Sequence, residues 1–253
     1  MIELATRDGY KLSAYRADPE GAPRGAVIVL QQGAEPAPHI RKMADLFASR
    51  GYVAIAPALD PEAFAAEAAA EAAGDSTPNA PSGTDQALAV VQAAIDNAAG
   101  AGKVALVGYS WGSDVAYAAA NALPDLACTV CYYGEGIVDA TGGKRRVPTL
   151  VHFAGNDNNV PSEKVTQFRA SRPDVSAYCY PDVGHGFGSD GEPGYDAAAA
   201  EAALSRTLFW LSQFIDGQPP LTLKNAGAYA LAKTDKKKSK KKEGGDDLGP
   251  PMD

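Results

Sequence analysis

The sequence predicts an α/β protein with a mostly parallel central sheet covered by helices on both faces. The first observation is an alternation along the chain, in which short apolar runs rich in β-branched residues take turns with longer stretches of helical periodicity. The second is that the apolar runs contain few polar residues, which is typical of parallel strands buried on both faces. A sheet of this kind places its ligand sites at the carboxyl ends of the strands.

The first half of the chain supplies three strand-like runs separated by helical segments. In the first helical segment Ile40, Met43 and Phe47 fall on one face, as the helical period requires. A later alanine- and glutamate-rich segment has high helix propensity, and the Ser, Pro, Asn and Gly residues after it are typical of a loop. The expected elements are strand 27–30, helix 39–50, strand 52–56, helix 61–73, loop 74–83, helix 84–99 and strand 104–107.

The second half continues the alternation into a final long helix and then changes character. We expect one globular domain over residues 1–216, with 217–232 as a linker or packed extension. Residues 233–253 are rich in lysine and poor in apolar side chains, so we expect a disordered tail that cannot offset the entropy cost of ordering. The expected elements are helix 112–122, strand 128–133, strand 149–154, helix 161–170, strand 175–180 and helix 195–215.

Charge and composition exclude several classes of function. The chain has 253 residues and a formal net charge of −8, so its body lacks the clustered positive charge that nucleic-acid binding needs. The start of the chain has no basic leader followed by an apolar run, and no segment reaches about eighteen uninterrupted apolar residues. We therefore expect a cytoplasmic protein without membrane contact.

The three cysteines form no disulfide framework, which fits a reducing compartment. Cys128 and Cys131 make a C-x-x-C pattern, but residues three apart on a strand point to opposite faces. We therefore expect both to be buried structural residues and not a redox pair or zinc ligands.

A serine between two glycines lies where an expected strand meets an expected helix, in Gly108-Tyr109-Ser110-Trp111-Gly112. In this G-x-S-x-G pattern a very tight turn lifts the serine clear of the sheet, and the glycines avoid side-chain clashes. A serine at this point is either a helix N-cap or a nucleophile. The position between strand and helix favours the nucleophile.

A serine nucleophile needs a base, and the chain has three histidines. His39 opens a helix and His152 lies inside an apolar strand, so we expect both to be structural. His185 sits between glycines in a loop just after a strand, where it can reach the carboxyl ends of the strands. His185 is therefore the candidate base.

The base in turn needs a carboxylate that fixes its tautomer. Asp157 follows strand 149–154 and precedes a helix, which places it at the same end of the sheet. Asp182 and Asp190 are other acids close to His185 in the sequence. The order serine, aspartate, histidine along the chain favours Asp157, because α/β-hydrolase triads have this order.

Five stretches of the chain carry a resemblance to the dienelactone hydrolase family of α/β-hydrolases, over roughly residues 1–215. The resemblance implies the α/β-hydrolase fold, with Ser110, Asp157 and His185 as the catalytic triad. It also implies that the backbone N–H groups of Trp111 and Gly33 form the oxyanion hole. The stretches are Pro-His-Ile-Arg-Lys-Met-Ala-Asp, Arg-Gly-Tyr-Val-Ala-Ile-Ala-Pro, Gly-Lys-Val-Ala-Leu-Val-Gly-Tyr-Ser-Trp-Gly, Tyr-Tyr-Gly and Gly-His-Gly-Phe.

Two features near the expected site depart from this family's pattern. The family's characteristic nucleophile is a cysteine, and Ser110 stands in its place, which suggests ordinary ester-hydrolase chemistry. Gln32 stands where the family has a glutamate that contacts the resting nucleophile, and Glu35 is close by. Gln32, Glu35 and Tyr109 are candidates for lining the site.

A third departure concerns the substrate. In the family, arginines hold the substrate's carboxylate, whereas here Ser189 lies near one of these places and residues 61–85 contain acids but no Arg or Lys. An anionic substrate would meet no counter-charge, so we expect a small neutral or weakly polar ester or lactone. We also expect segment 61–83 to form a lid or its remnant.

These observations together predict a serine hydrolase that works through an acyl-enzyme and needs no metal or organic cofactor. The sequence leaves two alternatives open. One is a thioesterase or amidase with the same triad, and the other is a non-catalytic binding protein with the same fold. It does not determine the oligomeric state.

Overall fold

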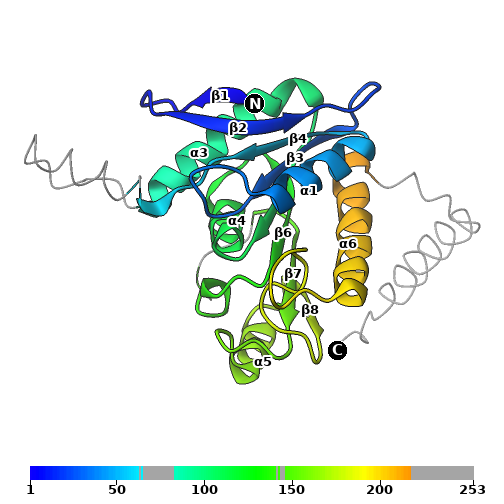
Figure 1. Cartoon of the computed structure of the whole chain (residues 1–253). Coiled ribbons are helices and arrows are strands. Elements are labelled where there is room, and N and C mark those ends of the chain that lie inside the picture. Colours follow the sequence, from blue (N-terminus) through cyan, green and yellow to red (C-terminus); the bar gives the residue numbers. More distant parts are fainter. Residues whose placement is uncertain (63, 65–82, 141, 143–145, 218–253) are drawn as a thin grey trace, which may run out of the picture. The chain divides into compact units, whose positions relative to one another are not determined.

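An eight-stranded sheet forms the centre of the part of the chain that the structure describes (Figure 1). The computed structural model describes residues 1–62, 64, 83–140, 142 and 146–217. Along the sheet the strand order is β1-β2-β4-β3-β5-β6-β7-β8, and all neighbours from β4 to β8 are parallel. The strands are β1 (Ile2–Ala5), β2 (Lys11–Ala17), β3 (Gly25–Leu30), β4 (Tyr52–Pro57), β5 (Val104–Tyr109), β6 (Leu126–Tyr132), β7 (Thr149–Ala154) and β8 (Ser176–Tyr180).

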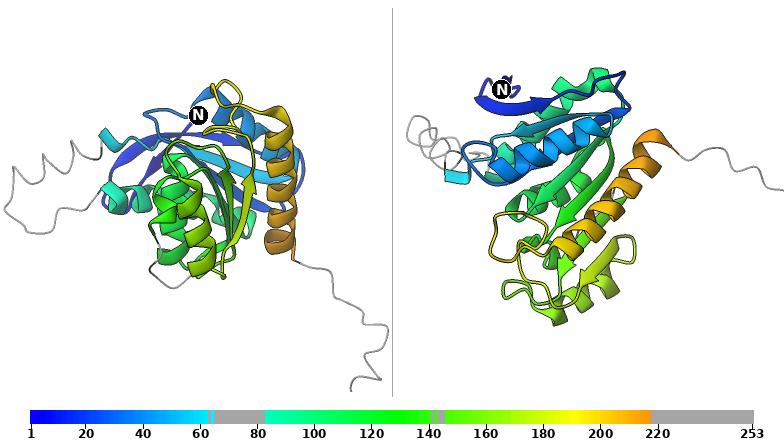
Figure 2. Two further views of the ribbon diagram at one scale, coloured as in Figure 1. Left: turned by 90° about the horizontal axis from the view of Figure 1, so that it is seen from below. Right: turned by 45° about the vertical axis from the view of Figure 1, so that its right-hand side comes forward.

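Helices cover both faces of the sheet, which confirms the predicted fold class (Figure 2). α1 (Pro38–Ser49) and α6 (Ala197–Leu211) bury their apolar side chains against one face. α3 (Gly83–Ala98), α4 (Trp111–Ala122) and α5 (Ser162–Ser171) cover the other. Every residue of β3, β4, β5 and β7 is buried, as expected for parallel strands enclosed on both sides. The other short helices described are the 3₁₀ helices η1 (Ala99–Ala101) and η2 (Gly136–Val138) and the π-helix η3 (Ser212–Asp216).

The two antiparallel strands at the start of the chain, β1 and β2, are not predicted by the apolar pattern. They bury little of their length, since only Leu4 of β1 and Leu12 and Ala14 of β2 are buried. The signal that would have found them is the Asp8-Gly9 turn between them, in which Gly9 has a φ of 96°. An Asp-Gly pair between short alternating runs is typical of a β-hairpin.

Other predicted boundaries differ little from the structure, or lie outside the described residues. The last helix begins at Ala197, two residues later than predicted, because the Asp196 side chain accepts the Ala199 N–H at 2.8 Å and caps it. Almost all of the predicted helix 61–73 and the loop after it lie outside the described residues. The same holds for nearly all of the predicted linker and for the lysine-rich tail.

The chain changes direction within the sheet at β3. From β3 it passes through α1 to β4 on one side, and from β4 it passes through α3 to β5 on the other side. Ligand sites of open α/β sheets form at the carboxyl ends of the strands where the order reverses in this way. Because Leu30 pairs with Gly108, the segment after β3 and the turn after β5 lie side by side at this point.

The turn from β5 into α4 brings backbone directly against backbone. A Cβ atom at Gly108 would lie 2.3 Å from the Gly112 carbonyl oxygen, and one at Gly112 would lie 2.3 Å from the Leu30 carbonyl oxygen. Neither backbone atom can move aside as a flexible side chain would. The packing of α4 on the ends of β5 and β3 therefore requires both glycines of the G-x-S-x-G pattern.

We predict that Gly112→Ala destabilises the protein, because the new methyl group would push α4 away from β3. Overpacking typically costs about 1–3 kcal/mol, and we expect a value at the upper end of this range since the clash is with backbone. Urea unfolding measures the change. Gly100→Ala is the control, because a Cβ atom there would meet nothing within 4 Å. Equal stability of the two variants would contradict the close contact.

Candidate active site

Ser110 directly follows β5 and occupies the N-cap position of α4 without capping it. Its backbone has φ 49° and ψ −126°, a conformation that L residues rarely adopt and that is held only where the surroundings enforce it. The side chain makes no cap hydrogen bond, and Ser110 Oγ lies 3.2 Å from His185 Nε2 instead. The structure thus places the hydroxyl as a nucleophile would need it and not as a helix cap.

Asp157 and His185 meet because the pairing of β7 with β8 continues beyond both strands. The Gly155 N–H donates to the Tyr180 carbonyl at 2.7 Å, and the Asn156 N–H donates to the Val183 carbonyl at 2.9 Å. Asp157 directly follows Asn156, and His185 lies two residues after Val183. His185 Nδ1 lies 2.9 Å from Asp157 Oδ2.

The tautomer of His185 follows from these contacts. An ionised carboxylate only accepts hydrogen bonds, so Nδ1 donates to Asp157 and Nε2 is left to accept from the Ser110 hydroxyl. The Asp157 side chain is 1% exposed, whereas the His185 side chain is 30% exposed. Asp157 Oδ1 also accepts the Asn159 N–H at 2.9 Å. A buried, fixed acid thus orients a histidine that a substrate can reach.

Tyr133, which the sequence does not single out as a site residue, lies beside this relay. It follows β6, the strand between β5 and β7, and it has a φ of 42°. Its ring lies edge-on to the His185 ring, with the centroids 5.0 Å apart, and its hydroxyl is 2.6 Å from Ser189 Oγ. The Tyr-Tyr-Gly stretch is the only sequence signal that points to it.

An ion-paired cluster ties the loop that carries His185 to α1. Asp190 Oδ1 accepts from His39 Nδ1 at 2.7 Å, and the Asp190 carboxylate also pairs with Lys42. These two hydrogen bonds, with Lys42 contributing most, lower the pKa of Asp190. His39 is therefore structural, as predicted, and Asp190 anchors the loop instead of serving the base.

His152 is buried within the sheet, also as predicted. Its Nδ1 lies 2.9 Å from the Tyr180 hydroxyl, and its Nε2 lies 3.2 Å from Thr207 Oγ1. Burial, with a smaller effect of Arg206, lowers the pKa of His152 to about 3, so this histidine is neutral. Both ring nitrogens are occupied within the core.

Ser113 fixes the turn that presents Ser110. It is fully buried, and its hydroxyl lies 2.6 Å from the Gly108 carbonyl and 2.7 Å from the Tyr132 carbonyl, to either of which it can donate. The same oxygen accepts the Tyr132 N–H at 2.8 Å. Ser113 therefore joins the ends of β5 and β6 immediately beneath the candidate nucleophile.

We predict that Ser113→Ala lowers the free energy of unfolding by about 1–3 kcal/mol, because it leaves the buried Tyr132 N–H without its acceptor. Chemical denaturation measures the loss. The exposed Ser49, whose hydroxyl donates to the Leu46 carbonyl, is the matched control. Ser49→Ala should stay within about 0.5 kcal/mol of the parent protein, and an equally small effect at Ser113 would argue against the buried network.

The two backbone amides expected to form the oxyanion hole are in different situations. Trp111 is the first residue of α4, so its N–H has no partner within the helix and lies at the positive end of the helix dipole. The Gly33 N–H donates to the Leu59 carbonyl at 2.7 Å, and the Leu59 N–H donates back to Gly33 at 3.0 Å. The Gly33 N–H is therefore engaged in a bridge to the segment after β4 in this structure.

Three other residues expected to line the site are exposed or have partners outside the relay. Gln32 is exposed, and the Glu35 side chain is 72% exposed and paired with Arg41. Tyr109 is buried on the α1 and α6 face, where its ring stacks on Tyr132 with centroids 4.7 Å apart. It lines a pocket of about 360 Å³ whose described lining residues include no member of the relay.

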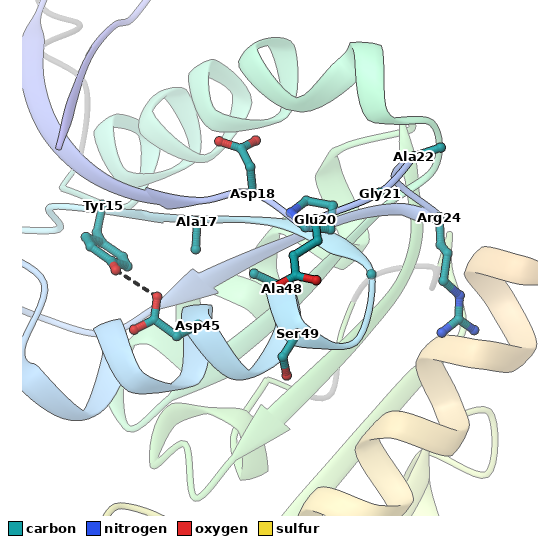
Figure 3. A pocket seen from close by; sticks show the side chains of 12 residues that line it. Tyr15, Ala17, Asp18, Glu20, Gly21, Ala22, Arg24, Asp45, Ala48 and Ser49 are labelled. Carbon is teal, nitrogen blue, oxygen red and sulfur yellow. Dashed lines mark hydrogen bonds between the residues drawn. The ribbon is translucent and has the colours of Figure 1, made fainter.

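A larger hollow of about 660 Å³ lies between β2 and α1 (Figure 3). Several of its polar side chains are engaged: the Tyr15 hydroxyl donates to Asp45 at 2.7 Å, and Asp18 is paired with Arg16. The lining residues that the structure describes include neither Ser110 nor His185. The hollow is thus separate from the candidate site.

The described residues hold neither a candidate metal site nor a helix that could span a membrane. Within these residues, no three His, Cys, Asp or Glu side chains are grouped so that they could hold a metal ion. None of the described helices is both long enough and apolar enough to cross a membrane. Cys128 and Cys131 lie in separate core clusters on opposite faces of the sheet, so they are not a redox pair.

Comparison with known proteins places the chain in a family. It matches the dienelactone hydrolase family over residues 12–215. It is 31% identical over 237 residues to an Escherichia coli K12 protein provisionally named a carboxymethylenebutenolidase. The alignment covers 81% of this chain and 84% of that protein. The carboxymethylenebutenolidase of Pseudomonas putida is 27% identical, with 86% of this chain and 98% of the relative covered.

A solved structure agrees with these sequence relatives. The crystal structure of a Klebsiella pneumoniae protein, provisionally described as a dienelactone hydrolase, superposes with a TM-score of 0.69 at 25% identity. The superposition covers 84% of this chain and 98% of that protein. Family match, relatives and fold therefore agree, and the chain belongs to the dienelactone hydrolase family of α/β-hydrolases.

Proposed function

We propose that this protein is a serine hydrolase that cleaves a carboxylic ester or lactone through an acyl-enzyme. The observation that carries the proposal is the continuous relay in which Ser110 Oγ is 3.2 Å from His185 Nε2 and His185 Nδ1 is 2.9 Å from Asp157 Oδ2. The strained backbone of Ser110 supports it, because strain of this kind is concentrated at functional sites. Membership of a family of ester-cleaving hydrolases supports the reaction class.

In the first half of the reaction, Ser110 Oγ attacks the carbonyl carbon of the substrate while its proton passes to His185 Nε2. The new C–O bond forms as the carbonyl electron pair moves onto oxygen, and Asp157 stabilises the imidazolium through Nδ1. The C–O bond to the leaving group then breaks, and His185 returns the proton to the departing alkoxide. In a lactone this alkoxide stays attached to the acyl group.

In the second half, water replaces the leaving group. His185 takes a proton from the water molecule, whose oxygen attacks the acyl carbon. The bond to Ser110 Oγ breaks, the serine recovers its proton from His185, and the carboxylic acid leaves. The same three side chains therefore serve both halves, with His185 alternating between base and acid.

The charge that develops on the carbonyl oxygen needs preorganised donors. We assign the Trp111 N–H, at the positive end of α4, as the first donor. For the Gly33 N–H to act as the second, its hydrogen bond to Leu59 has to open when substrate binds. The Gly33–Leu59 bridge is then a feature of the resting enzyme.

We assign a neutral acyl group to the substrate. Ser189, near the position where the family resemblance implies an arginine, is buried and bonded to the Tyr133 hydroxyl, so it offers no positive charge. Two carboxylates act on described residues beside the relay. Burial and, to a smaller extent, Glu135 raise the pKa of Asp114, and burial and, to a smaller extent, Glu192 raise the pKa of Tyr133. A substrate carboxylate would be repelled there.

The first test of this proposal replaces the nucleophile. Ser110→Ala should lower kcat for p-nitrophenyl acetate by a factor on the order of 10⁴–10⁶ and abolish labelling by a fluorophosphonate probe, since Ser110 is the proposed attacking group. Ser49→Ala should behave as the parent protein does. A loss of less than about tenfold at Ser110 would reduce this residue to a structural role, and a parent protein that does not label would favour a non-catalytic binding protein.

The second test concerns the charge of the substrate. We predict that kcat/KM is at least about tenfold higher for p-nitrophenyl butyrate than for mono-p-nitrophenyl succinate, which differs by a terminal carboxylate, because about 1.4 kcal/mol of repulsion gives this ratio. The difference should shrink as added salt screens the charges. A preference for the succinate would show that the site supplies a positive group and would overturn the assignment.

A further inference from the structure

Asp114 is a half-buried acid on the first turn of α4, one helical turn after Ser110. Its Oδ1 accepts the Gly136 N–H at 3.0 Å, and the Ile137 N–H also bonds to the carboxylate. Burial is the main cause that raises the pKa of Asp114 to about 6. An exposed acid would serve the helix N-terminus equally well, so the burial of this one has another reason.

The carboxylate acts as the cap of the segment that follows β6, residues 133–138. η2 begins in this segment, and its own N-cap residue, Glu135, makes no side-chain cap hydrogen bond. Asp114 supplies the missing acceptor from a different helix. A Cβ atom at Gly134 would lie 2.6 Å from Asp114 Oδ1, so the segment packs directly on the carboxylate.

Segment 133–138 has two contacts that lead to the relay. On one side, Tyr133 packs its ring against His185 and bonds to Ser189 of the same loop. On the other side, Glu135 Oε1 accepts from Asn159 Nδ2 at 2.6 Å. The Asn159 N–H in turn donates to Asp157 Oδ1, which leaves Oδ2 for His185.

We propose that Asp114 is a positioning residue of the active site: it anchors segment 133–138 and thereby holds Asp157 and His185 in line with Ser110. The proposal rests on the proposed function, since it assigns Asp114 a part in the alignment of that same relay. Asp114 acts only through Tyr133 and Glu135 and does not touch the reacting atoms. Small errors in such alignment reduce rate more than they reduce binding.

The charge of Asp114 affects alignment and stability in opposite directions. The titratable groups that act on it are Glu135, on the segment it anchors, and His185, on the loop after β8. Below about pH 6 Asp114 is protonated, and a neutral carboxyl accepts the Gly136 N–H less strongly. Because its pKa lies above the ordinary value of 3.8, its contribution to stability is full below that value and is lost as the pH rises through about 6.

The test compares Asp114→Asn, Asp114→Ala and the exposed control Asp125→Asn in the full chain. For each we would measure kcat and KM for p-nitrophenyl acetate, the rate of fluorophosphonate labelling, the melting temperature from pH 4 to 8, and amide hydrogen exchange at Gly136 and Ile137. The asparagine variant keeps an oxygen acceptor and loses the charge. The alanine variant loses both.

We expect Asp114→Asn to lower kcat and the labelling rate by about fivefold to tenfold, with KM within about twofold of the parent value. The melting temperature of this variant at pH 7.5 should be equal to or above that of the parent protein. Asp114→Ala should lower kcat by about a hundredfold and speed exchange at Gly136 and Ile137 by at least about tenfold. Asp125→Asn should match the parent protein in every measurement.

Values of kcat and labelling rate at parent levels in both Asp114 variants would overturn the proposal. Unchanged amide exchange at Gly136 and Ile137 in Asp114→Ala would overturn it as well. A loss of rate that follows a fall in melting temperature in Asp114→Asn would also count against it, since that is the mark of a purely structural residue. If the parent protein does not label at Ser110, the proposed function fails, whereas faster exchange in Asp114→Ala would still establish the anchor.

Discussion

The contact between the first turn of α4 and the ends of β5 and β3 determines the geometry of everything around it. Because Gly112 lies against the Leu30 carbonyl, the chain has no room for an ordinary strand-to-helix connection, and Ser110 takes the left-handed conformation. In that conformation the Ser110 hydroxyl lies 3.2 Å from His185 Nε2. The buried Ser113 hydroxyl then fastens the same turn to β6.

The parallel strands of the sheet bring the other groups of the candidate site to the same edge as Ser110. β5, β6, β7 and β8 are neighbours, and each delivers one group at its carboxyl end: Ser110, Tyr133, Asp157 and, after a short loop, His185. The loop that carries His185 is anchored on α1, through Asp190, and on Tyr133.

Much of the fold follows from the sequence because its strands are enclosed. Runs such as those of β3 and β5 have to be apolar throughout, and this pattern is visible without coordinates. β1 and β2 have weaker patterns because few of their side chains are buried. Their hairpin turn was the better signal.

The candidate relay was predictable for a related reason. Ser110 has its pattern, and His185 and Asp157 have the correct order and strand-end positions. What the sequence could not give are contacts between distant segments: the bridge that occupies the Gly33 N–H, the support from Ser113, and the packing of Asp114 on segment 133–138. These depend on which backbone groups become neighbours after the sheet has formed, and no local spacing encodes that.

The position of His185 beyond β8 has a consequence for how the enzyme is assembled. β8 is the last strand at one edge of the sheet, and 75 residues separate His185 from Ser110. A partly folded state that contains β3, β5 and β6 but lacks the docked edge would hold Ser110 without His185 beside it. Under the proposed function, recovery of hydrolysis during refolding therefore reports the docking of that edge strand, a non-local event, more directly than any spectroscopic measure of secondary structure.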